Sequence, residues 1–307
     1  MKKILAYITL SIVLLALVFY NDTITNFIMV NFIYKRDIVI EEPNPYKKNT
    51  KYQYVTEVSD FEPNNKKDLM NIIYTILNNG WDSFTFFCDT EYKDCTKDVN
   101  ELIDNKDLLS NLNNFVSPYN SYNRLFVNYN NFGKVTIDVE KIYSEEQIKQ
   151  VDNKIDEIMK TLIKPTMTTE EKIKAYHDYI INTTVYDSVN AEKLKNNQEI
   201  NRAENAHNAY GLLFNHKSLC GGYSDAIAIF LDKLNIPNMK VSTYSHVWNL
   251  VYINNQWYHL DATWDDPVVD TNENLLLHNY FLISNQQLQQ RDPLYHKFDS
   301  SIYVEAQ

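Results

Sequence analysis

A helix is predicted to begin within Leu219-Cys220-Gly221-Gly222-Tyr223-Ser224-Asp225-Ala226. Apolar residues continue one face of it at helical spacing as far as Leu234, and Asn235 and Pro237 end it. Cys220 therefore lies at the N-terminus, where the helix dipole and unpaired N–H groups stabilise a thiolate. Gly221 and Gly222 have no Cβ atoms, so a ligand carbonyl could approach the thiol closely; a tight turn into the helix is the structural alternative.

Two strands joined by a short turn are predicted downstream, at residues 246–253 and 256–261, with a further strand at 239–244. If Asn254-Asn255 is a two-residue turn, residue 253 pairs with residue 256, and His246 and Asp261 become diagonal neighbours on one face. Such neighbours lie about 7 to 8 Å apart, within side-chain reach of a hydrogen bond. A turn of another length would move Asp261 to the other face.

These side chains have the chemistry of a Cys-His-Asp triad. Cys220 would be the nucleophile, His246 would take or hold the thiol proton, and Asp261 would orient the imidazole and stabilise its charged form. His259 shares the face of His246 and is the alternative base, although a packing role is the simpler expectation for it.

Three motifs of the chain, in this order, resemble those of the transglutaminase-like core: Cys220-Gly221-Gly222-Tyr223, His246-Val247-Trp248-Asn249 and residues 257–267 (WYHLDATWDDP). The resemblance covers residues 168–283. It implies a papain-like α+β fold, in which the cysteine helix packs on an antiparallel sheet that carries the histidine and the aspartate. It also implies acyl transfer from a glutamine-type or peptide amide of a protein or peptide substrate, to water or to a second amine. The animal enzymes have Gln before and Trp after the cysteine, where this chain has Leu219 and Gly221, so their calcium regulation is not expected.

Other residues of these motifs are expected to support the site rather than react: Gly221, Gly222, Tyr223, Trp248, Asn249 and Trp264. The backbone N–H of Cys220 is one candidate oxyanion donor, and Tyr210 is a guess for the second. The alternative function is a catalytically inactive, membrane-tethered binding module that keeps the fold.

Cofactors and nucleic acid are not expected. The 7 histidines lack the H-E-x-x-H spacing of zinc sites, no C-x-x-C pair or Gly-rich phosphate loop is present, and the net charge is -11. Nucleic-acid binding favours basic surfaces instead.

The N-terminus is predicted to hold a membrane anchor over residues 1–36. Lys2 and Lys3 precede an uncharged run from Ile4 to Tyr20, which as a helix is about 25 Å long, enough to cross a bilayer. No A-x-A-like cleavage site follows, so an uncleaved single-pass anchor in the cell membrane, with the main domain outside the cytoplasm, is favoured over secretion after signal cleavage. Residues 27–34 are expected to continue the anchor at the membrane interface.

Three further segments complete the predicted organisation. Residues 37–60 are interpreted as a linker. Residues 61–143 have the pattern of a small α+β module, with helical spacing at 68–79 and 98–115, a strand at 83–88 and a hairpin at 124–142. The catalytic domain, 144–307, begins with two capping boxes, at Ser144 and Thr168. Cys88 and Cys95 could form a disulfide in an oxidising compartment, which would leave Cys220 as the odd thiol.

Overall fold

The computed structural model of the chain describes residues 2–19, 21, 24, 28, 38–89, 91–130, 133–268 and 275–307. Its first helix is α1 (Lys2–Phe19). In the part of the chain that is described, no helix has both the length and the apolar character of a membrane span. The predicted interfacial segment 27–34 lies, apart from Ile28, outside the described residues.

The segment interpreted as a linker is packed against the body of the protein. Its residues 38–60 form neither helix nor strand, yet Val55 is 1% exposed and lies in a core cluster. The buried Lys48 Nζ donates to Asn238 Oδ1 at 2.8 Å, and the Tyr52 hydroxyl donates to the Asn238 carbonyl at 3.0 Å. The linker interpretation is therefore corrected for this stretch, because its side chains pack against the folded body of the protein.

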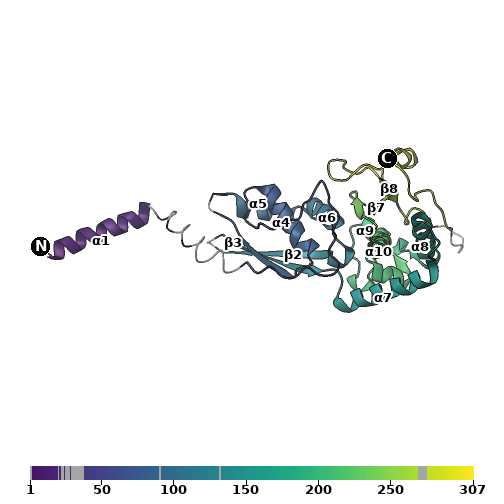
Figure 1. Cartoon of the computed structure of the whole chain (residues 1–307), viewed down its shortest axis with the longest axis horizontal. Helices are drawn as coiled ribbons and strands as arrows, with labels where there is room; N and C mark the ends of the chain where they lie inside the picture. Colours follow the sequence, from purple (N-terminus) through teal and green to yellow (C-terminus); the bar gives the residue numbers. More distant parts are fainter. Residues whose placement is uncertain are drawn as a thin grey trace.

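The module between residues 61 and 143 combines an antiparallel sheet with three helices (Figure 1). The sheet order is β1 (Ser83–Phe87), β3 (Lys134–Lys141), β2 (Tyr122–Tyr129), and the helices are α4 (Lys66–Asn78), α5 (Cys95–Asp104) and α6 (Lys106–Asn114). The helical pattern at 98–115 is divided between α5 and α6 because the Asn105 side chain caps α6 by accepting from the Leu108 N–H. Cys88 and Cys95 form the predicted disulfide, and Cys220 is free.

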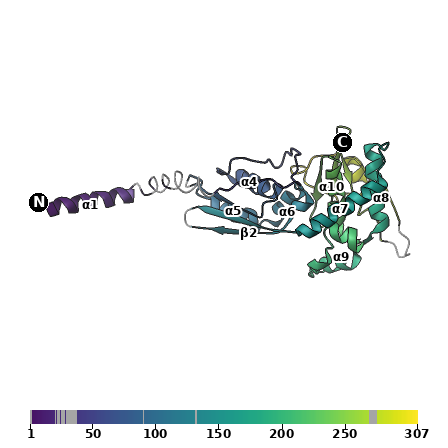
Figure 2. The same cartoon turned by 60° about the horizontal axis from the view of Figure 1, so that its bottom comes forward.

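The second half of the chain surrounds the helix that begins at Cys220, α10 (Cys220–Lys233) (Figure 2). The capping boxes at Ser144 and Thr168 begin α7 (Glu145–Leu162) and α8 (Thr169–Thr183) as predicted. The antiparallel sheet has the order β6 (Asn238–Ser242), β7 (Val247–Ile253), β8 (Gln256–Leu260). Shorter elements of this half are β4 (Val185–Tyr186), α9 (Ser188–Lys195), the 3-10 turn η3 (Arg202–Glu204), the π-helical turn η4 (Gly211–Asn215), β5 (Lys217–Ser218) and α11 (Asn285–Arg291). The 3-10 turn η2 (Pro118–Asn120) belongs to the 61–143 module.

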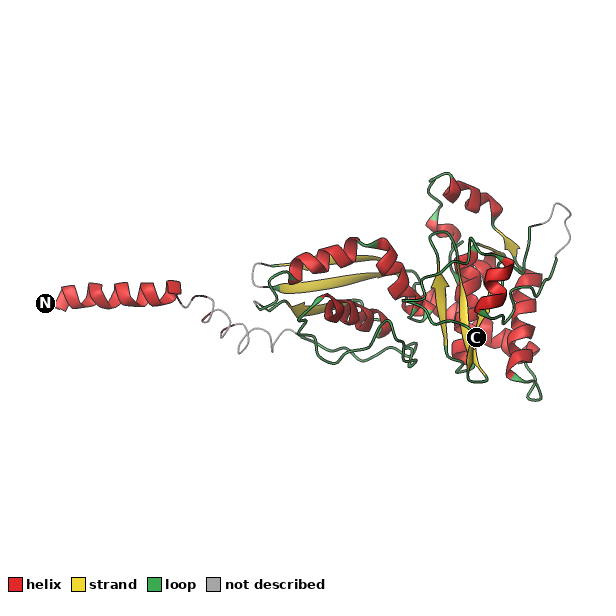
Figure 3. Ribbon diagram, turned by 90° about the horizontal axis from the view of Figure 1, so that it is seen from above, coloured by secondary structure: helices red, strands yellow, loops and turns green. Residues whose placement is uncertain are grey.

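The central strand β7 is buried on both faces. Val251 belongs to the core cluster around α7, α8 and α10, whereas Trp248 and Leu250 belong to the cluster that also contains the core of the 61–143 module. Asn114 of α6 adds a 2.7 Å hydrogen bond to Ser242 of β6. Figure 3 shows the two sheets that this shared core joins. The module is therefore a packing layer for the sheet of β6, β7 and β8, and the two sides of the predicted boundary at 143/144 share one core cluster.

The hairpin between β7 and β8 has the predicted two-residue turn. Ile253 pairs with Gln256, and both turn residues have left-handed backbone conformations, Asn254 at φ 51° and Asn255 at φ 64°. This is the geometry of a type I′ turn, which asparagine adopts more easily than most residues. The turn fixes the register that places His246 and Asp261 at the same end of the sheet.

Replacing Asn255 with a β-branched residue is expected to destabilise the fold. Asn255→Val should lower the free energy of unfolding by about 1 to 2 kcal/mol, the cost of a left-handed conformation for such a side chain. Asn255→Gly should not lower it, because glycine adopts positive φ freely. Urea unfolding of both variants checks this, and an equal loss in the two would contradict the assigned role of the turn.

Candidate active site

The thiol of Cys220 lies at the first residue of α10, preceded by an extended Leu219 whose N–H donates to the Ala206 carbonyl at 2.7 Å. The parallel pairing of β4 with β5 brings Tyr186 opposite Ser218, two residues before the cysteine. Cys220 as a residue is partly buried. It lies at a helix N-terminus, as the sequence predicted.

The two glycines after Cys220 are required by backbone packing. A Cβ atom on Gly221 would lie 2.6 Å from the His207 carbonyl oxygen, and one on Gly222 would lie 2.7 Å from the Asn208 carbonyl oxygen. Real Cβ contacts are essentially never that short, so the backbone of residues 207–208 could not pack against this turn if either glycine were alanine. The structural alternative, a tight entry into the helix, therefore explains both glycines, and the expectation that they open the thiol to a ligand is not needed.

His246 and Asp261 meet at the end of the hairpin. His246 Nε2 donates to Asp261 Oδ2 at 2.5 Å, and both residues are buried, at 9% and 1% exposed. Cys220 lies close enough to His246 to contribute, with Asp261, to raising its pKa. Because Nε2 faces Asp261, Nδ1 is the ring nitrogen left for the thiol. The fold therefore brings the three predicted residues together.

The charges and hydrogen bonds around His246 favour its charged imidazolium form. Burial alone would lower the pKa of His246, but the charge of Asp261 and hydrogen bonds with Asp261 and Cys220 outweigh it and raise that pKa to about 10. Burial would likewise raise the pKa of Asp261, and the neighbouring His246 and His296 hold it well below its ordinary value. Such an arrangement stabilises an imidazolium facing a carboxylate on one side and the thiol on the other.

The predicted supporting residues surround the imidazole, with one exception. Trp248 stacks on His246 with ring centroids 5.6 Å apart, and Trp264 lies 6.0 Å from it. Asn249 Nδ2 donates to the Ser224 carbonyl and the Tyr223 hydroxyl donates to Asp266, so both connect α10 to the hairpin. Tyr210 stacks on Phe214, and no contact described in the structure joins it to Cys220.

His259 is occupied elsewhere and does not act as the base. Trp248 Nε1 donates to its Nδ1 at 3.0 Å, and its Nε2 donates to Asn285 Oδ1 at 2.6 Å. Burial lowers the pKa of His259 to about 4, which keeps it neutral. This is the packing role that was the simpler expectation.

Sequence reasoning missed a second histidine on Asp261. His296 Nε2 lies 2.8 Å from Asp261 Oδ2, and His296 Nδ1 lies 2.7 Å from Asp292 Oδ2. His296 stands 35 residues after Asp261, and it follows the end of α11, so nothing in the local sequence relates it to Asp261. Tyr186 was also given no role; burial, Cys220 and Asp261 raise its pKa to about 12.

Two groups of side chains have the composition of a metal site: His246, Asp261 and His296, and separately His177, Asp178 and His278. In the second group His278 Nε2 and His177 Nδ1 lie 2.6 and 3.0 Å from the same Asp178 oxygen. Ligands of one tetrahedral zinc ion, at 2.0 to 2.1 Å from it, stand about 3.3 Å apart. The separations in both groups are those of hydrogen bonds, so these atoms are better explained as ionic networks.

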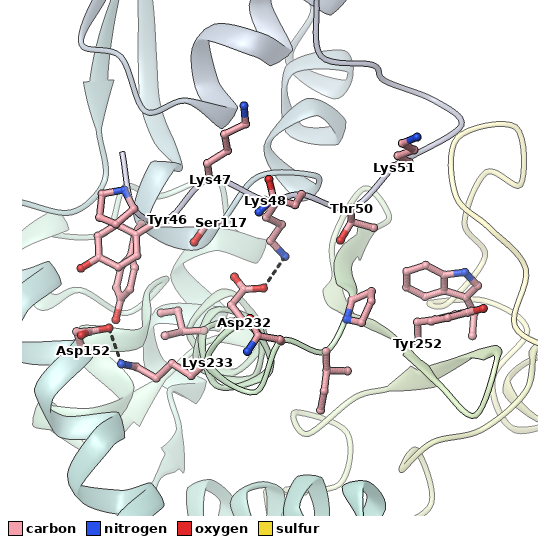
Figure 4. Close-up of a pocket in the computed structure, with 18 residues that line it drawn as sticks. Tyr46, Lys47, Lys48, Thr50, Lys51, Ser117, Asp152, Asp232, Lys233 and Tyr252 are labelled. Carbon is pink, nitrogen blue, oxygen red and sulfur yellow. Dashed lines mark ion pairs between the residues drawn. The ribbon is translucent and has the colours of Figure 1, made fainter. Parts of the chain in front are cut away.

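A cavity lies at the end of α10 opposite to Cys220, and Figure 4 shows the residues that line it. It has a volume of about 900 Å³ and is bordered by Asp232, Lys233 and the hairpin residue Tyr252. Lys48 pairs with Asp232 at 3.3 Å and Lys233 with Asp152 at 2.7 Å. Thirteen helical residues separate this cavity from the thiol, about 20 Å. It is therefore not the place of the triad chemistry.

Comparisons with known proteins point to one family. Residues 156–262 match the family model described as the transglutaminase-like superfamily. A stretch of 133 residues, 38% of this chain, is 25% identical to the Kyphoscoliosis peptidase of Homo sapiens and spans 19% of that relative's length. Among solved structures, a TGase is similar at TM-score 0.36 and 16% identity, covering 50% of this chain and 48% of the other. A protein from Cytophaga hutchinsonii assigned as a cysteine protease is similar at TM-score 0.29 and 13% identity, covering 60% of this chain and 70% of the other. Because both TM-scores are low, the family model carries the assignment.

The protonation of His246 is expected to depend on Asp261. In the wild-type protein the imidazole should lose its proton near pH 10, and in Asp261→Asn near the ordinary value of about 6.5 or lower, because burial then dominates. Since the folded pKa is raised, the stability that this ion pair contributes is complete below about pH 6.5 and is lost as the pH rises through 10. Titration of the histidine rings by NMR measures the shift. A His246 pKa unchanged by Asp261→Asn would refute the assigned pairing.

Proposed function

Residues 156–262 belong to the transglutaminase-like superfamily, and on that premise we propose that the protein is a cysteine-dependent enzyme acting on amide bonds of proteins or peptides. The observation that carries the proposal is that Cys220, at the start of a helix, lies beside His246, whose Nε2 is hydrogen-bonded to the buried Asp261. A family fold alone does not specify chemistry, whereas a nucleophile, a base and an orienting carboxylate in contact do.

The proposed reaction proceeds in two acyl transfers. The Cys220 thiolate attacks the amide carbonyl carbon, and a C–S bond forms while the C–N bond breaks. His246 gives its proton to the leaving amine, so a thioester and a neutral imidazole remain. Water or a second amine then attacks the thioester, His246 takes a proton from this nucleophile, and the thiolate leaves. The backbone N–H of Cys220 is the proposed donor to the oxyanion in both steps.

A binding module without turnover is the second candidate function. It is favoured by one observation: among the described residues, Tyr210 has no contact with Cys220, so the oxyanion donor that it was expected to supply is not in place. Hydrolysis and crosslinking differ only in the second nucleophile, and both remain within the proposal.

Removing the nucleophile or the base should abolish turnover. We expect Cys220→Ala and His246→Ala to lose at least about 1000-fold in rate, because these groups act as one unit. His278→Ala, which removes a more exposed histidine bonded to Asp178, is the control and should retain the wild-type rate.

The assay offers a glutamine peptide with an amine donor, and separately a plain peptide, and detects crosslinked or cleaved products by mass spectrometry. A wild-type protein that gives neither product, and whose Cys220 is no more reactive to iodoacetamide than a free cysteine, would favour the binding module.

Membrane attachment through residues 1–36, with the main domain outside the cytoplasm, is part of the proposal. The full chain is expected in the membrane fraction, extractable by detergent but not by high salt, whereas a chain beginning at residue 38 should be released. Protease treatment of intact cells tests the orientation. Recovery of the full chain in the soluble fraction would remove the anchor from the proposal, and recovery there of a shortened chain would support cleavage.

A further inference from the structure

Asp261 carries two histidines on one oxygen. His246 Nε2 and His296 Nε2 lie 2.5 and 2.8 Å from Asp261 Oδ2, while Oδ1 accepts from the backbone N–H groups of Thr263 and Trp264 at 2.9 and 3.2 Å. The carboxylate, 1% exposed, therefore has four donors. Both histidines therefore fix the orientation of this carboxylate.

His296 is itself held by a second carboxylate. Its side chain is 0% exposed, and its Nδ1 faces Asp292 Oδ2 at 2.7 Å. Both ring nitrogens of His296 thus face carboxylate oxygens, so the ring links Asp292 to Asp261.

Aromatic rings close this second pair away from water. Tyr280 stacks on His296 with centroids 5.2 Å apart and an interplanar angle of 16°, and the edges of Trp248 and Trp264 each lie 4.8 Å from it. Low local polarity strengthens the hydrogen bonds inside and makes an unpaired partner costly. His296 is thus fixed by its surroundings rather than free to leave Asp261.

From this geometry we propose that His296, held by Asp292, is a positioning residue of the Cys220 site: it fixes and shares the Asp261 carboxylate that orients His246. The inference rests on the proposed function. It places a necessary part of the site in the C-terminal segment, beyond residues 156–262 that match the family model. His296 does not touch the thiol or the substrate carbonyl, and it acts only through Asp261.

The test uses iodoacetamide labelling of Cys220 in the full chain, across pH 4 to 9. His296→Phe should slow labelling at neutral pH by about 10- to 100-fold, the usual loss when a buried partner of a site residue is removed. In this variant the pH below which labelling falls off, the acid limb of the profile, should rise by about 1 unit, because His296 helps to hold Asp261 ionised. His296→Gln, which keeps an N–H donor, should slow the labelling of Cys220 less than His296→Phe does. Asp292→Asn should also slow it. The other titratable groups facing Asp261 are Tyr186, His259 and Tyr280, and they are unchanged in these variants.

His177→Phe is the matched control. His177 is also 0% exposed and also lies between two carboxylates, Asp178 and Asp265, but it makes no bond to Asp261. It should lose similar thermal stability and keep the wild-type labelling rate and acid limb. His296→Phe indistinguishable from His177→Phe would overturn the positioning role.

The NMR titration of His246 separates this inference from the proposed function. If wild-type Cys220 labels no faster than a free thiol, the proposed function fails. A changed His246 pKa in His296→Phe, with none in His177→Phe, would still support positioning through Asp261. An unchanged His246 pKa, together with unchanged labelling, would overturn it.

Discussion

The meeting of His246 with Asp261 depends on two consecutive asparagines in the left-handed conformation. Their turn sets the pairing of β7 with β8, and with a period of two a single-residue slip would send one of the two side chains to the opposite face. His246 and Asp261 meet only in this register. Strand β7 is locked in place because it is apolar on both faces and is covered on both, by α10 and by the 61–143 module.

Much of this arrangement was accessible from local pattern. The helix at Cys220, both capping boxes and the hairpin register each follow from signals within a few residues, and those signals agree with one another. The linker interpretation of residues 37–60 failed for a different reason. Its prolines and lysines indicate irregular backbone correctly, but the partners that bury Lys48 and Val55 are remote in sequence. Composition predicts the absence of helix better than the absence of packing.

The contacts that were not predicted also join residues that are remote in sequence. His296 reaches Asp261 across 35 positions, from beyond the end of α11, so nothing in the sequence near His296 indicates this contact. The glycines after Cys220 were interpreted through the thiol, whereas the carbonyls of His207 and Asn208 explain them. Buried polar groups must find partners, and those partners are selected by the tertiary fold, which single-sequence reasoning does not supply.

The segment that carries Asp292 and His296 is also tied to the 61–143 module. The Tyr303 hydroxyl donates to Asn111 Oδ1 of α6 at 2.6 Å, and Asn114 Nδ2 of the same helix donates to the Tyr303 hydroxyl at 2.7 Å. This segment is therefore held on two sides, by Asp261 through His296 and by α6 through Tyr303. A change in the packing of the module can reach the candidate site through it, although no residue of the module lies among the three predicted site residues.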